Sequence, residues 1–186
     1  MNLLLILAFL ITSTSSYTSP SPPSSRRSFL STSSSLAFPF LLPSLSSASE
    51  PLIPVYFGAG CFWHVQHEFV VGEIQLLKRT ESQLTSRAGY AGGTKVGKDG
   101  RVCYHNLGMK DEYGKLGHCE VVGLNIPQSS FKDFCKIYFS LYDKKGNRPD
   151  QLGDRGGEYR SIIGYPGGYS NVELTGIVKE VSGEFG

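Results

Sequence analysis

The sequence predicts an α+β domain with two layers, in which helices pack on one sheet. Apolar residues alternate from Ile53 to Phe57, as in a strand, and then recur every three or four residues, as in an amphipathic helix. The same change of spacing occurs twice more along the chain. The order strand, helix, strand, helix, strand, helix favours a ferredoxin-like sandwich with a mixed sheet and helices packed on it.

Composition excludes several classes of protein. The 186 residues include 18 Lys and Arg and 16 Asp and Glu, and Arg26 and Arg27 are the only charged side chains before Glu50. The remainder is therefore formally neutral, and no basic field suggests a nucleic-acid partner. Four cysteines without a CxxC pair are too few for a disulfide-dense scaffold, so we expect a few functional thiols. They are Cys61, Cys103, Cys119 and Cys135.

Residues 1–49 have the composition of a targeting presequence, so we assign the fold to residues 50–186. Leu3 to Ile11 is an apolar run with the length of a signal-peptide core, and it precedes a Ser, Thr and Pro-rich stretch without acidic residues, as in a transit peptide. Twin arginines at Arg26 and Arg27, followed by an apolar segment and small residues, resemble an export signal. In series these elements predict delivery to a plastid, with the thylakoid lumen as destination. The alternative is a secretory signal with a Ser-rich linker, which would place the protein in the secretory or endomembrane system.

The first strand leads into Gly58-Ala59-Gly60-Cys61-Phe62-Trp63, and the helical pattern begins at Phe62. Cys61 therefore lies at the helix N-terminus. Unpaired N–H groups and the helix dipole there favour a thiolate and lower a thiol pKa, which predicts a reactive cysteine. The alternative is a buried structural cysteine.

The next segments differ in how clearly they can be assigned. The first helix runs to about Lys78, and the polar segment up to Arg87 has no clear assignment. Gly89-Tyr90-Ala91-Gly92-Gly93 predicts a turn-rich loop that continues through Gly100.

A second strand begins at Gly117-His118-Cys119-Glu120. Alternation places Glu120 on the same side as the apolar residues that follow it, and Cys119 and Val121 on the other. A carboxyl at the edge of an apolar face loses hydration, which raises its pKa and suits a general acid. The alternative is a solvated glutamate at a strand end. The apolar residues on its side are Val122, Leu124 and Ile126.

The remaining elements complete the alternation. Ser130 to Asp133 has the pattern of a capping box for a second helix, whose apolar face includes Cys135 as a core residue. Residues 143–149 predict a turn. A Gly-bearing loop from Leu152 leads into a strand through Ile163, and apolar residues from Leu174 to Val181 predict the last helix.

The residues alone leave several chemistries open. Cys61 beside Phe62 and Trp63 suggests a nucleophile next to an apolar pocket. A cysteine hydrolase would need a histidine base, and four histidines are available. A metal site at Cys61, His64 and His67 is disfavoured because the three side chains would spread over about 120° of the helix surface. We therefore predict no metal site. The histidines are His64, His67, His105 and His118.

Five blocks in register carry a resemblance over residues 53 to 165. They are Gly60-Cys61-Phe62-Trp63, Gly89-Tyr90-Ala91-Gly92-Gly93, Tyr104-His105-Asn106-Leu107-Gly108, Gly117-His118-Cys119-Glu120 and Gly153-Asp154-Arg155-Gly156-Gly157-Glu158-Tyr159-Arg160-Ser161. Together they resemble the A-class peptide methionine sulfoxide reductases, which reduce the S epimer of methionine sulfoxide.

The resemblance implies a role for each matching residue. Cys61 would be the nucleophile that becomes a sulfenic acid, and Phe62 and Trp63 would hold the substrate methyl group. Glu120 would protonate the sulfoxide oxygen. Tyr104 and Tyr159 would hydrogen-bond that oxygen, and Asp154 would support the site. The implied activity is that of a peptide-methionine (S)-S-oxide reductase in protein repair under oxidative stress.

The resemblance also implies partners, and the sequence departs from the family at several points. Substrates would be free or protein-bound methionine sulfoxide, and the reductant an external thiol such as thioredoxin, glutathione or glutaredoxin, without a bound cofactor. We expect a monomer, outside the membrane in its mature form.

His64 replaces a small residue after Trp63, where it would stabilise the thiolate or narrow the entrance to the site. The family's C-terminal region with recycling cysteines is missing, which suggests a truncated C-terminus. Cys103 is the first candidate for a resolving thiol, and direct reduction by an external thiol is the alternative. A catalytically impaired homologue that binds oxidised methionine is the alternative function.

Overall fold

The structure is a computed structural model that describes residues 50–108 and 110–185. The predicted presequence, residues 1–49, and the localisation deduced from it lie outside the described residues. The strands are β1 (Leu52–Gly58), β2 (Arg87–Ala91), β3 (Cys119–Pro127) and β4 (Ile162–Gly164). The helices are α1 (Phe62–Leu77), α2 (Phe131–Ser140) and α3 (Val172–Glu184).

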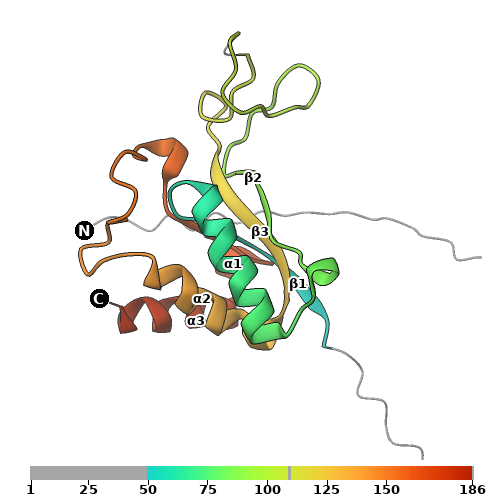
Figure 1. Cartoon of the computed structure of the whole chain (residues 1–186), viewed down its shortest axis with the longest axis vertical. Coiled ribbons are helices and arrows are strands. Elements are labelled where there is room, and N and C mark those ends of the chain that lie inside the picture. The colour runs from blue at the N-terminus through green and yellow to red at the C-terminus, as the bar shows by residue number, and fades with distance from the viewer. Residues whose placement is uncertain (1–49, 109, 186) are drawn as a thin grey trace, which may run out of the picture. The chain divides into compact units, whose positions relative to one another are not determined.

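The four strands form one sheet in the order β2-β3-β1-β4, with helices packed on it (Figure 1). This arrangement confirms the two-layer α+β prediction. The expectation of a mixed sheet was wrong, because all three strand pairs are antiparallel. Along the chain, β1 precedes α1 and β2 follows it, and the two strands run in the same direction. In the sheet, β3 lies between them and is antiparallel to both. The result is a split βαβ unit of the ferredoxin-like type.

The sequence did not predict β2. Residues 89–91 were expected to lie in a turn-rich loop, whereas the structure pairs Arg87 to Ala91 with Gly123 to Cys119 of β3. Glycine and alanine have little strand preference of their own, and strand formation here comes from pairing with a neighbour remote in sequence. In the connection from β2 to β3, residues 92–108 and 110–118 extend beyond the sheet (Figure 1).

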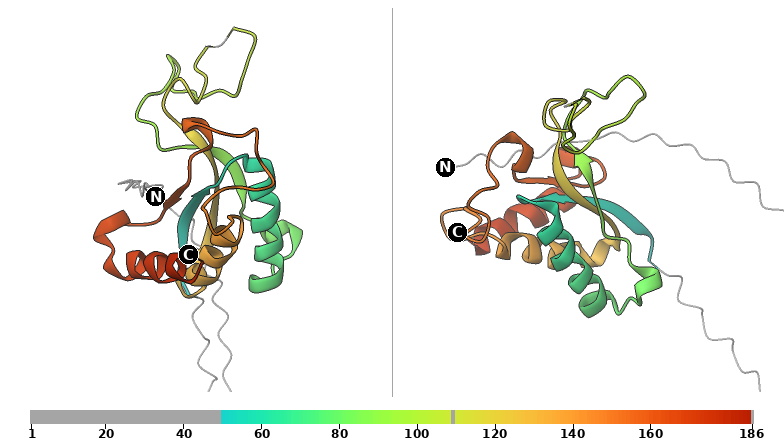
Figure 2. Two further views of the ribbon diagram at one scale, coloured as in Figure 1. Left: turned by 90° about the vertical axis from the view of Figure 1, so that its left-hand side faces the viewer. Right: turned by 45° about the horizontal axis from the view of Figure 1, so that its top comes forward.

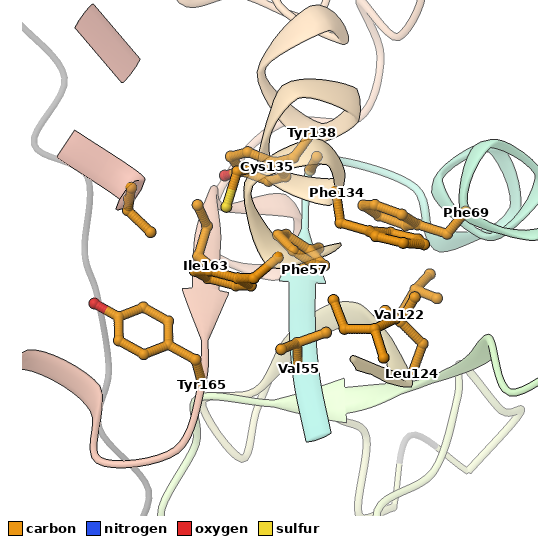
Figure 3. Close-up of a cluster of buried hydrophobic side chains, with 14 of the residues drawn as sticks. Val55, Phe57, Phe69, Val122, Leu124, Phe134, Cys135, Tyr138, Ile163 and Tyr165 are labelled. Carbon is orange, nitrogen blue, oxygen red and sulfur yellow. The ribbon is translucent and has the colours of Figure 1, made fainter. Parts of the chain in front are cut away.

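One face of the sheet carries the main core. α1 and α2 cover this face and α3 packs against α2, as the views in Figure 2 show. Phe57 of β1 lies at its centre, stacked on Phe69 of α1 with ring centroids 4.7 Å apart, and Tyr138 of α2 lies 5.5 Å away (Figure 3). Cys135 is fully buried in this core, as predicted.

Strand alternation in β3 is also confirmed. The side chains of Val122, Leu124 and Ile126 belong to the core beneath the helices. Cys119 and Val121 instead pack with Ile162 in a small cluster. Glu120, which shares its side with the first group, is therefore directed toward the helix layer.

The capping box predicted for α2 is absent. Residues 128–130 form a 3₁₀ turn that leads into the helix, and Ser130 has helical backbone angles and makes no side-chain cap. Because the chain is already helical at Ser130, its hydroxyl cannot take the usual N-cap position. Glu50 caps this region instead, accepting hydrogen bonds from the N–H of Ser129 at 2.8 Å and from its hydroxyl at 2.5 Å.

The C-terminal end of α1 is fastened to β2 through a buried carboxylate. Glu73 is fully buried and accepts hydrogen bonds from Arg79 and from the backbone and hydroxyl groups of Thr85 and Ser86. Burial raises the pKa of Glu73, but the hydrogen bonds from Ser86, Arg79 and Thr85 outweigh it and hold this pKa below its ordinary value. In the described part of the chain, no helix is long and apolar enough to cross a membrane.

Candidate active site

Cys61 lies at the junction of β1 and α1, as the sequence predicted. It is the N-cap residue of α1, with extended backbone angles (φ −63°, ψ 126°), and its own side chain makes no cap. Gly60 before it has φ +77°, a left-handed conformation that favours glycine. The thiol is free and partly buried, and it does not cap the helix.

The first N–H groups of α1 have separate partners. The N–H of Cys61 donates to the Gln151 side-chain oxygen at 2.8 Å, and the N–H of Phe62 donates to Glu120 Oε2 at 2.8 Å. The N–H groups of Trp63 and His64, which follow in the helix, lower the pKa of the Cys61 thiol. The helix N-terminus therefore serves both the sulfur and a carboxyl that enters from β3.

The expectation of a lowered thiol pKa at Cys61 was wrong. Burial is the largest effect and raises the pKa of the thiol; the N–H groups of Trp63 and His64 lower it, and the charges of Glu120 and Asp154 raise it further. The net direction is upward. Sequence reasoning included the helix N-terminus, but desolvation and two carboxyls outweigh it. If Glu120 carries a proton, its part of this effect disappears.

Glu120 is 1% exposed, which rules out the alternative of a solvated residue at a strand end. One carboxyl oxygen accepts the N–H of Phe62, and the other accepts the hydroxyl of Tyr113 at 3.0 Å. Among the described residues no Lys, Arg or His forms a salt bridge with it. Glu120 is thus a buried carboxyl, adjacent to the cysteine loop, with two hydrogen bonds and no cation.

Aromatic rings surround this carboxyl. Phe62 is nearly buried and lies 5.8 Å from Tyr90 and 6.1 Å from Tyr104, measured between ring centroids. Tyr113 stacks on Tyr90 at 4.6 Å. Trp63 meets Phe62 edge-on at 5.3 Å and remains 67% exposed. Phe62 and Trp63 therefore form an apolar surface in which the Phe62 ring is buried and the Trp63 ring is exposed.

Tyr113 is the functional candidate that sequence reasoning missed. Tyr104 and Tyr159 were the expected partners of the sulfoxide oxygen, but the hydroxyl that binds Glu120 belongs to Tyr113. Tyr104 is 46% exposed and its ring lies parallel to that of Tyr113 at 6.0 Å. Burial, with the charges of Glu120, Cys61 and Asp154, raises the pKa of Tyr104. The signal that could have found Tyr113 is its place seven residues before Glu120, in the loop that enters β3.

The loop before β4 brings Asp154 and Tyr159 to the same place. Burial is the largest effect on the pKa of Tyr159 and raises it. An interaction with Tyr113 lowers this pKa, the charges of Glu120 and Asp154 raise it, and the net direction is upward. Asp154 also acts on Cys61. These two residues and Gln151 line a pocket of about 520 Å³ that reaches Gly60. The charges of Glu120 and Asp154 act on Cys61, Tyr104 and Tyr159, so the five predicted catalytic residues lie in one region.

Cys103 lies in the loop that carries the tyrosines. Its carbonyl accepts the N–H of Tyr113 at 2.8 Å and its N–H donates to Asp111 at 2.8 Å. All four cysteines are free, so the resolving role of Cys103 stays a prediction. Burial raises the pKa of Cys119 to about 11 and that of Cys135 to about 12, which makes both poor thiolates.

His64 is held away from a role as the base of a cysteine hydrolase. Its Nδ1 lies 2.6 Å from the Asp150 carboxylate and 2.8 Å from an Arg148 nitrogen, and its Nε2 lies 3.4 Å from Glu68. Both ring nitrogens of His118 contact the backbone, at Gly93 and Lys95. In residues 50–108 and 110–185, no group of three or more His, Cys, Asp or Glu side chains is placed to hold a metal ion.

Comparison with known proteins agrees with the motifs. The family model described as peptide methionine sulfoxide reductase matches residues 54–184. The chain belongs to this family. A relative named peptide methionine sulfoxide reductase MsrA from Geobacter metallireducens is 33% identical over 113 residues, which cover 58% of this chain and 57% of the relative. Another MsrA, from Ruthia magnifica, is 29% identical over 129 residues, covering 68% and 69% of the two chains.

The match covers only part of each of these relatives. The chain spans between about half and two thirds of the curated relatives that it matches. A solved structure, methionine sulfoxide reductase A of Corynebacterium diphtheriae, is 18% identical, with a TM-score of 0.45 over 72% of this chain and 57% of that one. The resemblance to the A class, deduced from five sequence blocks, is confirmed by the family match and the MsrA names of the relatives.

Proposed function

We propose that this chain reduces methionine S-sulfoxide, free or in proteins, to methionine in a thiol-dependent reaction. The main support is the junction of two elements: the carboxyl of Glu120 in β3 accepts the N–H of the residue that follows Cys61. This contact supports the proposal that Cys61 acts as the nucleophile and Glu120 as the proton donor beside the apolar side chains of Phe62 and Trp63. Reduction of a sulfoxide requires this combination, because its oxygen leaves only after protonation.

In the proposed reaction the Cys61 sulfur attacks the sulfur of the substrate. Glu120 gives its proton to the sulfoxide oxygen, and the Tyr104 and Tyr159 hydroxyls hydrogen-bond that oxygen. The substrate methyl group packs against Phe62 and Trp63. Oxygen ends on Cys61 as a sulfenic acid, so the cysteine sulfur loses two electrons, the substrate sulfur gains two, and methionine leaves.

Regeneration needs a second thiol. Cys103 would attack the sulfenic acid of Cys61, forming a disulfide and releasing water, and an external dithiol of the thioredoxin or glutaredoxin type would then reduce the disulfide. A small thiol such as glutathione could attack the same sulfur directly. Neither route uses a bound cofactor.

The test is methionine formation from the S and R sulfoxides with dithiothreitol as reductant. We expect the S epimer to be consumed, the R epimer to remain, and Cys61→Ser to abolish turnover. Binding of the S epimer without any methionine would favour an impaired homologue that recognises oxidised methionine. Ester or amide cleavage through an acyl-enzyme, without reductant, would favour a cysteine hydrolase.

The role of Cys103 has its own test. Without reductant, we expect the Cys103→Ser variant to release one methionine per chain from excess S-sulfoxide. With thioredoxin as the only reductant, we expect the variant to stop after this single turnover. Rapid quenching and amino-acid analysis measure both quantities. Loss of the first turnover in this variant would refute the resolving role, although it would leave the chemistry at Cys61 possible.

We also propose that residues 1–49 deliver the protein to a plastid, with the thylakoid lumen as destination. The support is the sequence alone, with its apolar run, acid-free Ser-rich stretch and twin arginines. A fluorescent protein fused to residues 1–49 should accumulate in the plastid. Accumulation in the secretory pathway would favour the secretory alternative, and Arg26→Lys with Arg27→Lys should block only the final step.

A further inference from the structure

We propose that Arg148 and Gln151 are positioning residues for Cys61, and that His64 and Asp150 hold Arg148 in place. The four side chains form a clamp between the first turn of α1 and the loop that follows α2. It acts on the backbone of residues 59–61, directly before the helix. The inference extends the proposed function, and its main readout does not depend on that function.

Gln151 acts on the cysteine residue itself. Its side-chain oxygen accepts the N–H of Cys61 at 2.8 Å, across ninety positions of sequence. The approach is so close that a Cβ at Gly60 would collide with this oxygen. The left-handed φ of +77° favours glycine at position 60, and a larger residue there would displace the Gln151 side chain from the N–H of Cys61.

Arg148 acts on the residue before Gly60. Its guanidinium donates a hydrogen bond to the carbonyl oxygen of Ala59, which is fully buried. The Arg148 side chain is only 7% exposed, so its charge needs a partner. Asp150 supplies one, with carboxylate oxygens 3.2 Å from Nε and 3.0 Å from Nη2.

His64 closes the clamp from the helix. Its Nδ1 lies 2.8 Å from Arg148 Nη2 and 2.6 Å from Asp150 Oδ2, while Glu68, one turn along α1, faces Nε2 at 3.4 Å. Arg148 thereby links the helix side chain at position 64 to the backbone at position 59. This linkage fixes the angle at which the chain enters α1.

The chemical consequence concerns which N–H groups remain for the sulfur. Gln151 takes the N–H of Cys61 and Glu120 takes that of Phe62. The N–H groups of Trp63 and His64, which come next in the helix, both lower the pKa of the Cys61 thiol and so favour the thiolate. Because burial and two carboxyls oppose ionisation at this site, a small rotation of the turn would remove the only contributions that assist it.

The test measures alkylation of Cys61 by iodoacetamide as a function of pH, followed by the mass of the Cys61 peptide. Gln151→Met keeps the side-chain length and loses the acceptor, and we expect about tenfold slower alkylation at neutral pH and a profile displaced to higher pH. His64→Ala should act in the same direction, by about threefold. His67→Ala is the matched control, since His67 is exposed on the same helix, and it should leave the profile unchanged.

The outcome separates positioning from a purely structural role. If Gln151→Met and His64→Ala only lower the melting temperature and leave the alkylation profile unchanged, the proposal is wrong. If Gln151→Met does not fold, His64→Ala at the partly exposed position decides alone. With a methyl sulfoxide substrate, both variants should lower kcat and leave KM nearly unchanged; absence of turnover in the wild type would refute the proposed reaction without affecting the alkylation result.

Discussion

Two buried glutamates near opposite ends of α1 have opposite surroundings. Glu73 lies near the C-terminal end and is fully buried, and Glu120 reaches the N-terminal end from β3 and is 1% exposed. Glu73 receives hydrogen bonds from five donor groups, one of them the guanidinium of Arg79. Glu120 receives two hydrogen bonds and has no salt-bridge partner among the described residues.

In the proposed reaction the same type of side chain serves structure at Glu73 and proton transfer at Glu120. Five donors, one of them the Arg79 cation, keep the Glu73 carboxylate ionised, so that it fastens the helix end to β2. Glu120 has only two donors, the N–H of Phe62 and the hydroxyl of Tyr113, and both are neutral groups. A carboxyl that must give up a proton and regain it requires the second kind of environment.

The largest effect is expected for Glu120→Gln. The amide keeps the shape and can still accept the N–H of Phe62, but it has no proton to give. We expect sulfoxide reduction to fall by about 10²–10⁴, the range that a positioned proton donor contributes, with little loss of stability. Steady-state rates and thermal unfolding check both parts. A variant that unfolds readily yet keeps its rate would reverse the assignment of Glu120.

Glu73→Gln should show the opposite pattern. Removing a buried charge leaves Arg79 unpaired and weakens the hydrogen bonds from Thr85 and Ser86, which we expect to cost about 3–5 kcal/mol of unfolding free energy. Denaturant titration measures the loss. The rate per folded molecule should stay within about twofold, since Glu73 lies near the far end of α1. An equal loss of rate would show that the two ends are coupled.

Acid should sharpen the comparison further. The pKa of Glu73 is lowered on folding, so its stabilisation is present above the ordinary carboxyl value of 4.5 and is lost as pH falls below it toward the folded value. The wild type should therefore lose more stability than Glu73→Gln as pH falls below about 4.5. Urea titrations of both proteins over this window test the sign. Parallel curves would mean that Glu73 titrates alike in the folded and unfolded states.

The smallest effect is expected at Tyr113. Tyr113→Phe removes the hydroxyl that binds Glu120 at 3.0 Å and keeps the ring stacked on Tyr90. We expect about a tenfold lower rate and a cost of about 1 kcal/mol in stability. Tyr104→Phe is the comparison variant, because its hydroxyl was expected from the sequence to serve the same site. A larger loss at Tyr104 than at Tyr113 would show that the substrate oxygen, not Glu120, depends most on the tyrosines.

Sequence alone located the parts of the site that follow periodic patterns. The elbow at Cys61 and the inward direction of Glu120 both follow from strand and helix spacing, which reports burial. The tyrosine that binds Glu120 could not be found in this way, because residues 92–118 have no period from which a side-chain direction can be deduced. β2 was missed for a related reason, since its pairing with β3 depends on the assembled sheet.

Electrostatic properties were the least predictable. The helix N-terminus at Cys61 is visible in the sequence, and its N–H groups do lower the pKa of the thiol. The desolvation and the carboxyls of Glu120 and Asp154, which reverse the expected direction of the thiol pKa, arise only when three distant segments meet. The same is true of Gln151 and Arg148, which lie in a stretch that the sequence indicates only as turn and loop.

The most direct test of the proposed chemistry is the mass of the Cys61 peptide after the Cys103→Ser protein reacts with one equivalent of methionine S-sulfoxide. A cyclic diketone present during the reaction would trap a sulfenic acid. We predict one methionine released per chain and the diketone adduct on Cys61, with the R epimer giving neither. Recovery of intact S-sulfoxide with an unmodified Cys61 would contradict the account.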